Sequence, residues 1–302
     1  GMSLDTCTVP GSVKESRIKG GMAELGLGIH GEPGVQQVDF AGAEQAMATL
    51  LTHATGALDR ASVFGLRMVQ YENLARYADA LDSARRGLAL FDMVLPTSEA
   101  HKQARLASEI ERIETLIGAR TNRTIASLIE LPTMRDPGMR MVMNILTDIW
   151  SPAYILGDAT LARLISALLV RLSLEHGQCE ESAYGYVTHA ITVGPVRRDY
   201  ASAYAFGTLA LEVNRRFDDR QRRAKIQQQF HAHVNLWCRP MQSCIDYARQ
   251  ACRSGLASGD FLYAAYGAST ESWPALVSCQ DLGECVRSLE PNLALVVQLR
   301  NT

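Results

Sequence analysis

From about residue 58 onward, apolar residues recur with the 3.6-residue period of α-helices, and this periodicity limits the possible folds more than any other feature. One stripe of leucine and isoleucine positions is especially regular, and Arg163, Ser166 and Arg171 lie off it. Prolines interrupt the periodic segments at intervals that suit helical hairpins. The pattern therefore predicts a mainly α fold of paired antiparallel helices. The stripe is Leu161, Leu164, Ile165, Leu168 and Leu172, and the prolines are Pro96, Pro132, Pro137, Pro152, Pro195, Pro240 and Pro274.

The first 56 residues differ from the rest because glycine is concentrated there. Residues 23–30 alternate between apolar and small or polar side chains, as a half-buried strand does, and the Gly-Glu-Pro-Gly sequence at 31–34 predicts a turn. A second strand is expected at 35–40 and an amphipathic helix at 43–54. We therefore expect a short α/β segment, residues 1–57, followed by a helical region, residues 58–302.

The charge balance and the cysteines narrow the class of protein. Thirty basic and 32 acidic side chains give a formal net charge of −2, which argues against a nucleic-acid-coating protein. An apolar run of about 18 residues, which a membrane span needs, does not occur, and the N-terminus lacks the pattern of a signal peptide. Seven scattered cysteines without a C-x-x-C pair are typical of reduced thiols. We expect a cytoplasmic protein without membrane or nucleic-acid partners.

A weak internal repeat runs through the helical region. A tyrosine followed by small residues at helical spacing occurs twice, and small residues allow neighbouring helices to approach closely. A tyrosine that opens the second helix of a pair resembles the tetratricopeptide (TPR) signature. The repeated positions are Tyr77, Ala80, Leu81, Ala84 and Gly87, and then Tyr200, Ala203, Tyr204, Gly207 and Ala210.

A longer series of strings extends this resemblance over residues 58–302. The region is similar to the TPR-like helical-repeat region of large multidomain proteins that combine an AAA-type ATPase module with a sensor histidine kinase. The resemblance implies a TPR-like antiparallel array that binds protein partners and carries no catalytic residues. The matching strings are Leu131-Pro132-Thr133-Met134-x-Asp136-Pro137, Pro152-Ala153-Tyr154, Ser182-Ala183-Tyr184, Asp199-Tyr200, Ala205-Phe206-Gly207, Trp237-x-x-Pro240, Gly259-Asp260 and Tyr263-Ala264-x-Tyr266.

The glycines of the N-terminal segment fit the spacing of the dinucleotide-binding fingerprint at Gly26, Gly28 and Gly31. In that fingerprint a helix begins at the third glycine, whereas Pro33 and Gly34 form a turn here. An acidic residue about 20 positions further on, within a strand–helix–strand unit, is also missing. Nucleotide binding at this motif is therefore not expected.

The whole glycine-rich string gives a better account. Residues 7–11 (C-T-V-P-G) and 22–35 (M-A-E-L-G-L-G-I-H-G-E-P-G-V) resemble the second half of the substrate-binding domain of dihydroxyacetone (glycerone) kinases. The resemblance implies that His30 adds to the ketone of dihydroxyacetone and forms a covalent hemiaminal. A neutral imidazole is a competent nucleophile towards a carbonyl. Gly28 leaves room for a three-carbon ligand, and Gly31 allows backbone N–H groups to face it; the alternative is a histidine that merely ends a strand.

The rest of the kinase machinery has no counterpart in the sequence. The half of the family's domain that carries the aspartate base is absent, and so is the helical domain that binds ATP through magnesium-coordinating aspartates. A G-x-x-x-x-G-K-[ST] loop that could replace it is absent as well. We expect no cofactor in this chain, with ATP and magnesium entering only through another subunit. The prediction is a kinase-like segment fused to an interaction scaffold; an active or complemented glycerone kinase is the alternative.

Three other groups of residues have side chains that could bind a ligand. His231, His233, Cys238 and Cys244 are metal-type ligands, but the two histidines point to different sides of a predicted helix, so a zinc site is not expected. The run from Arg215 to Arg223 mixes both signs of charge and predicts a solvated, salt-bridged connector, with a phosphate- or nucleic-acid-binding patch as the alternative. The aromatic residues Tyr184, Tyr186, Tyr200, Tyr204 and Phe206 are expected to pack between helices and not to form a ligand cage.

Overall fold

The computed structural model describes residues 40–120 and 124–299, and within these ranges every regular element is a helix. An isolated bridge between Thr133 and Gln178 is the β contact found there. The mainly α fold is confirmed, and the strand expected at 23–30 lies outside the described residues. The strand expected at 35–40 does not include Phe40, because α2 begins at that residue and not at 43. The helices are α2 (Phe40–His53), α3 (Ala57–Asn73), α4 (Tyr77–Ala89), α5 (Glu99–Gly118), η1 (Ala126–Glu130), α6 (Pro137–Ile155), α7 (Ala159–His176), α8 (Glu180–Arg197), α9 (Tyr200–Arg216), α10 (Arg220–His233), η2 (Asn235–Trp237), α11 (Gln242–Ser258), α12 (Phe261–Thr270), α13 (Ser272–Ser278) and α14 (Leu282–Leu299).

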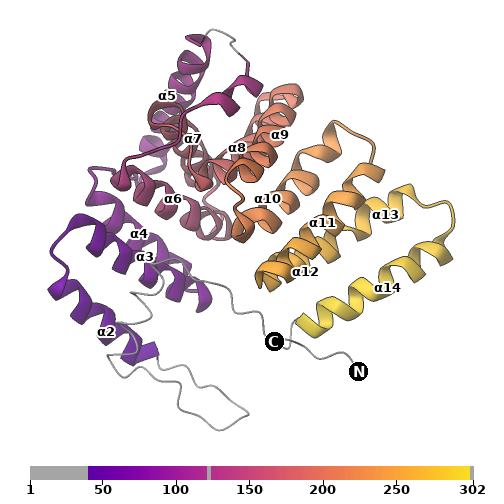
Figure 1. Cartoon of the computed structure of the whole chain (residues 1–302), viewed down its shortest axis with the longest axis horizontal. Coiled ribbons are helices and arrows are strands. Elements are labelled where there is room, and N and C mark those ends of the chain that lie inside the picture. Colours follow the sequence, from indigo (N-terminus) through magenta and orange to yellow (C-terminus); the bar gives the residue numbers. More distant parts are fainter. Residues whose placement is uncertain (1–39, 121–123, 300–302) are drawn as a thin grey trace.

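Most of the helices form two rows, and the chain alternates between the rows as it proceeds (Figure 1). The first row consists of α3, α6, α8, α10, α12 and α14, and each of these helices packs against the next. The second row consists of α4, α7, α9, α11 and α13. Each second-row helix packs between two consecutive helices of the first row, as α9 does between α8 and α10. The chain therefore builds a continuous array of helical hairpins, and one hydrophobic core extends from α3 to α10.

The same short loop joins several of these helices. It places one residue in the left-handed conformation and then an aspartate that caps the next helix. At Gly157 and Asp158 the aspartate Oδ1 accepts the backbone N–H of Leu161 over 3.0 Å. A left-handed residue ends one helix at low cost only when it is glycine, and the aspartate satisfies a backbone donor that the helix leaves free. The loop recurs at Arg198–Asp199, Asp218–Asp219 and Gly259–Asp260.

The core is deepest around α6, α7 and α8. All five positions of the predicted leucine and isoleucine stripe on α7 are buried, which confirms that prediction. Ser166, which lies off the stripe, is nevertheless fully buried. Its hydroxyl accepts the indole N–H of Trp150 over 2.9 Å and donates to the Ala162 carbonyl. Because both partners are within reach, a polar side chain is tolerated there. In the described part of the chain, none of the helices combines the length and hydrophobicity that crossing a bilayer requires.

The small residues of the predicted repeat lie where helices approach most closely. A Cβ added at Gly87 of α4 would lie 3.3 Å from the Phe64 Cβ of α3 and 3.1 Å from the Ile145 Cδ1 of α6. One added at Gly207 of α9 would lie 2.7 Å from the Phe230 ring of α10. In both cases a second-row helix contacts the first row, so the repeated pattern marks equivalent positions in the array.

Two of the prolines do not separate helices as expected. Pro152 lies inside α6 and Pro195 lies inside α8. Both fall in the last turn or just before it, where the helix loses one backbone hydrogen bond and is not divided. Pro137 occupies the first turn of α6, where its missing N–H has no cost. Each of these prolines thus lies close to the end of a helix, but not always at the end itself.

An additional helix interrupts the alternation between α4 and α6. Helix α5 packs on the outside of α7, where Arg171 forms ion pairs with both Glu109 of α5 and Glu175. The chain then returns through η1, and the Arg216 guanidinium fixes this return by donating to the carbonyls of Ile129 and Leu131 over 2.6 and 2.9 Å. This excursion leaves the first row continuous from α3 to α6.

Candidate functional site

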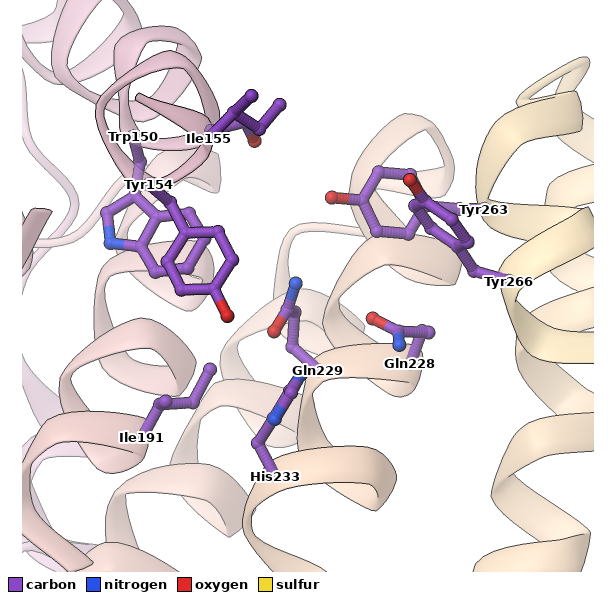
Figure 2. Close-up of a pocket in the computed structure, with 10 residues that line it drawn as sticks. Trp150, Tyr154, Ile155, Ile191, Gln228, Gln229, His233, Tyr263 and Tyr266 are labelled. Carbon is purple, nitrogen blue, oxygen red and sulfur yellow. The ribbon is translucent and has the colours of Figure 1, made fainter. Parts of the chain in front are cut away.

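A cleft of about 260 Å³ lies across the first row of helices (Figure 2). Every residue that lines it comes from a first-row helix, namely α6, α8, α10 or α12, and none comes from the second row. The residues are Trp150, Ser151, Tyr154, Ile155, Ile191, Gln228, Gln229, His233, Tyr263 and Tyr266. Helical arrays bind partners on surfaces of this kind.

Aromatic rings form two opposite walls of the cleft (Figure 2). On α6, Trp150 and Tyr154 lie one turn apart, and their rings stack at 5.3 Å with an interplanar angle of 7°. On α12, Tyr263 and Tyr266 meet edge to face at 5.5 Å. Tyr154 is 59% exposed and Tyr266 is 46% exposed, so both rings are accessible to a ligand. These walls offer apolar area together with polar hydroxyl groups.

The side chains of Gln228 and Gln229 lie between the two walls (Figure 2). They are only 6% and 8% exposed, yet neither Oε1 atom has a hydrogen-bond partner within the described residues. A buried amide oxygen without a partner costs free energy, because it has lost its hydrogen bonds to water. Two such amides side by side in a cleft are typical of a site whose polar partner is a ligand or bound water.

His233 adds a third polar group and no charge. Burial lowers the pKa of its imidazole below the ordinary value, because a buried environment disfavours the charged form. At neutral pH the side chain is therefore an uncharged donor and acceptor. The remaining lining residues carry no ionisable acid or base other than tyrosine.

A charged cluster borders the cleft on α10. The Lys225 Nζ lies 4.4 Å from the centre of the Tyr184 ring and 5.4 Å from that of Tyr263. Burial disfavours its charged form, but the interactions with Tyr184, Tyr263, Asp148 and Glu72 outweigh burial and raise the pKa of Lys225. Burial also raises the pKa values of Asp148 and Glu72, against the attraction of the basic side chains. Lys225 thus stays charged and is held against two rings.

Tyr184 connects this cluster with the cleft. Its ring meets Trp150 edge to face at 5.8 Å, and its buried hydroxyl makes no hydrogen bond to a described residue. Nearby, Arg222 pairs with Glu181 over 3.0 Å and with Asp219 over 3.2 Å. The Oε2 atom of Glu181 is also without a partner there. Unsatisfied buried atoms thus gather along α8 and α10.

The predicted substrate-binding residues Gly28, His30 and Gly31 lie outside the described residues. The packing prediction for the aromatic residues is confirmed at Tyr184, Tyr186 and Phe206, which are at most 4% exposed. Tyr200, at the start of α9, is 36% exposed but also packs between elements, since its ring lies beside Gly194 of α8 and 5.9 Å from the ring of Trp237. Tyr204 is half-buried against Phe230 at 5.9 Å.

The four metal-type side chains do not come together. The His231 ring lies 3.1 Å from the Thr270 hydroxyl, whereas the Cys238 thiol lies 3.3 Å from the Tyr200 carbonyl. Cys244 contacts Asn235 and the His231 carbonyl. More generally, residues 40–120 and 124–299 contain no group of three or more ligand-type side chains that could hold a metal ion.

The run from Arg215 to Arg223 is a salt-bridged connector, as predicted. It contains the end of α9 and the start of α10, and Asp218 pairs with Arg223 over 2.8 Å. Arg222 departs from the prediction of a solvated run, because its side chain is only 18% exposed.

Sequence reasoning missed the cleft itself. Trp150 and Tyr154 are four residues apart, and Tyr263 and Tyr266 are three apart, so each pair shares one helix face. This spacing was visible in the sequence. That the two faces meet across α8 and α10 depends on the order of the helices in the array, and a single sequence does not show that order.

Comparisons with known proteins concern the N-terminal part of the chain. A family model described as the Dak1 domain matches residues 1–74. The chain is 41% identical over 63 residues to "Triokinase/FMN cyclase" of Bos taurus, which covers 21% of this chain and 11% of that protein. The proteins of the same name from Homo sapiens (40% over 63 residues) and Mus musculus (42% over 55 residues) match over 21% and 18% of this chain and over 11% and 10% of their own length. No solved structure matches the chain.

The resemblance of the N-terminal segment to dihydroxyacetone kinases is thereby confirmed. The match runs beyond residue 57 to the end of α3. Helix α3 is the first helix of the array, and the Phe64 carbonyl accepts the Ser83 hydroxyl of α4 over 3.1 Å. The described end of the matched segment is therefore part of the helical array.

Proposed function

We propose that the chain is an interaction scaffold whose first-row cleft binds an extended segment of a protein partner, and that a partial dihydroxyacetone-kinase-like segment precedes it. The observation that carries this proposal is the pair of buried side chains Gln228 and Gln229, whose Oε1 atoms have no hydrogen-bond partner among the described residues. A peptide backbone offers one donor and one acceptor per residue, which is what an amide group needs.

The array supports this proposal in a second way. The rows of helical hairpins, the repeated capped loops and the small residues at Gly87 and Gly207 agree with a TPR-like array. In such an array each unit adds one first-row helix to a continuous surface, so a cleft across α6, α8, α10 and α12 offers contacts along several residues of an extended chain. The scaffold is proposed to act in the cytoplasm.

A selection from an unbiased library of displayed peptides tests the scaffold function. The full chain is the target, and selected peptides are then measured by calorimetry against the wild type, the Tyr154→Ala/Tyr266→Ala variant and Tyr200→Ala. Tyr200 is a matched control because it is an exposed tyrosine outside the cleft. We expect peptides whose binding is lost in the cleft variant only. If no selected peptide depends on the cleft, the proposal is wrong.

The Dak1 match supports a second candidate function at the other end of the chain, which is capture of a short ketone. We propose that the His30 imidazole adds through one nitrogen to the ketone carbon of dihydroxyacetone. The unprotonated nitrogen forms a C–N bond and the carbonyl π bond breaks. The oxygen takes up the proton that the other imidazole nitrogen loses, so no atom leaves. Gly28 is proposed to leave room for this ligand, and Gly31 is proposed to let backbone N–H groups face it. ATP-dependent phosphorylation would need ATP and magnesium held by another subunit.

Two measurements separate these possibilities. With dihydroxyacetone labelled at the ketone carbon, ¹³C NMR detects the change from a carbonyl to a tetrahedral carbon, and we expect the new signal to vanish in His30→Ala. A coupled assay with ATP and magnesium is expected to show no phosphorylation above background for the chain alone. Phosphorylation that His30→Ala abolishes would instead support the alternative, an active glycerone kinase.

A further inference from the structure

We propose that the cleft binds an uncharged, proline-rich segment in the polyproline II conformation. This inference rests on the proposed scaffold function and names the class of partner that the cleft takes. Three properties of the cleft support it, namely the placement of its aromatic rings, its uncommitted hydrogen-bonding groups and its lack of charge.

The aromatic rings are placed for a chain that lies between them. Trp150 and Tyr154 stand on one wall, and Tyr263 and Tyr266 stand on the other, with the two glutamines between (Figure 2). Proline-rich segments dock into aromatic-lined grooves, where the flat rings pack against the pyrrolidine rings. Because the polyproline II helix is already extended and stiff, little conformational entropy is lost on binding.

The hydrogen-bonding groups match what such a segment lacks. A polyproline II helix has no internal hydrogen bonds, so every carbonyl needs an external donor, and proline itself supplies no N–H. Within the described residues, the Oε1 atoms of Gln228 and Gln229 have no hydrogen-bond partner, and Tyr154, Tyr263 and Tyr266 line the same cleft. The hydroxyls and the amide N–H groups are donors for the carbonyls. The amide oxygens accept the few N–H groups that non-proline residues supply.

The lack of charged side chains in the cleft lining disfavours charged ligands. Its lining contains no aspartate, glutamate, lysine or arginine, and the Lys225 ammonium beside it faces the rings of Tyr184 and Tyr263. A charged side chain placed between the walls would lose its hydration without gaining an ion pair. An amphipathic helix fits less well, because its apolar face would cover the two amides without satisfying them.

A direct titration tests the proposal. The full chain with Trp237→Phe and Trp273→Phe keeps Trp150 as its one tryptophan, since the sequence contains three. A blocked peptide of Pro-Pro-Ala repeats is titrated onto it, and a blocked helix-forming peptide of alanine and glutamine serves as the comparison. We expect a saturable change in Trp150 emission with the proline-rich peptide and none with the helical one.

Calorimetry with cleft variants then locates the binding. Tyr154→Ala/Tyr266→Ala is expected to weaken the proline-rich peptide about tenfold or more, as the loss of two aromatic contacts does at an interface. Tyr154→Phe/Tyr266→Phe keeps the rings, so it should lose less affinity, and Tyr200→Ala should bind like the wild type. Far-UV circular dichroism confirms that the variants are folded; the two tyrosines are largely exposed, so their replacement leaves the core intact.

Two results would overturn the inference. One is the absence of saturable binding of the Pro-Pro-Ala peptide to the wild type. The other is binding that the Tyr154→Ala/Tyr266→Ala variant leaves unchanged. If the peptide library still yields binders without proline that depend on the cleft, the scaffold function stands and only the partner class is wrong. If it yields no cleft-dependent binder at all, both proposals are wrong.

Discussion

Three buried glutamines, one in the α7–α8 loop and two in the cleft, use the same side chain in different ways. Gln178 precedes α8 and uses its whole amide: Nε2 donates to the Leu128 carbonyl over 2.9 Å, and Oε1 accepts from Arg216 over 3.0 Å. Gln228 and Gln229 are almost as deeply buried, and their oxygens have no partner among the described residues. The hydrogen bonds of Gln178 stabilise the fold, whereas the unsatisfied oxygens of Gln228 and Gln229 are the ones that we propose serve a partner.

The aromatic residues repeat this contrast. Tyr186 and Phe206 stack at 6.2 Å between α8 and α9, and His189 meets Phe206 edge to face at 5.0 Å. We call these three residues the packed cluster. The cleft rings of Tyr154 and Tyr266 are about half exposed instead. The rings of the packed cluster therefore stabilise the fold, whereas the half-exposed rings of the cleft are the ones to which we assign the proposed binding.

The largest expected difference between the two regions concerns ring removal. Phe206→Ala should lower the free energy of unfolding by about 3–5 kcal/mol, because it leaves a cavity in the packed cluster. Tyr154→Ala removes an exposed ring and should cost less than about 1 kcal/mol. Urea unfolding followed by circular dichroism measures both. Equal losses would show that the cleft rings are core residues.

Acid should weaken the packed cluster through His189. Burial, with a smaller contribution from the positive charge of Arg197, lowers the pKa of His189 from 6.5 to about 4 in the folded protein. Between these two pH values the unfolded chain binds more protons, so stability falls as pH drops from about 6.5 to 4, by about 3 kcal/mol. His189→Gln should remove this share of the pH dependence, as followed by urea unfolding at each pH.

His101 is the matched control for this prediction. It is an exposed histidine in the first turn of α5, away from the packed cluster. His101→Gln should therefore leave the slope of stability against pH close to that of the wild type. The prediction for His189 is contradicted if both variants flatten the slope to the same extent.

Replacing a glutamine by leucine should cost much more stability at Gln178 than at Gln229. Gln178→Leu removes one of the two donors to the Leu128 carbonyl and one of the acceptors of Arg216, so we expect a loss of about 1–3 kcal/mol. Gln229→Leu replaces a group without partners and should change stability by less than about 0.5 kcal/mol or raise it. Thermal and urea unfolding of the two variants, side by side, check this difference.

Substitutions in the loops that join the rows should give the smallest changes in the free energy of unfolding. Arg198 is exposed and has a φ of 55°, which strains a residue with a Cβ, so Arg198→Gly should stabilise by about 0.5–1 kcal/mol. Gly157 has a φ of 76° in the equivalent loop, and Gly157→Ala should destabilise by about 1 kcal/mol. Neither change should alter peptide binding, because both lie outside the cleft. Shifts of the same sign in the two variants would contradict the equivalence of these loops.

Much of the helical fold could be predicted from the sequence. The stripe from Leu161 to Leu172 is periodic because one face of α7 is buried, and that signal is local. The positions of Gly87 and Gly207 were also predictable, since small residues at helical spacing mark close contacts. The prolines were less reliable, because Pro152 and Pro195 are accommodated within the ends of their helices.

The cleft could not be predicted in the same way. Its walls come from α6 and α12, which are more than 100 residues apart in the chain, and its amides come from α10. Sequence periodicity identifies the buried face of each helix but not the helices that lie opposite one another. The burial of Gln228 and Gln229 without partners is likewise a property of the assembled array, because glutamine in a helix is ordinarily exposed.

The most direct test of the account combines binding and stability in one variant, Gln228→Leu/Gln229→Leu. The Pro-Pro-Ala peptide is titrated by calorimetry onto the variant and the wild type, and urea unfolding is measured on the same samples. If the amides serve a partner, affinity falls about tenfold or more while the free energy of unfolding is unchanged or higher. If they serve the fold, the variant loses several kcal/mol of stability, or it binds the peptide as the wild type does, and the account is contradicted.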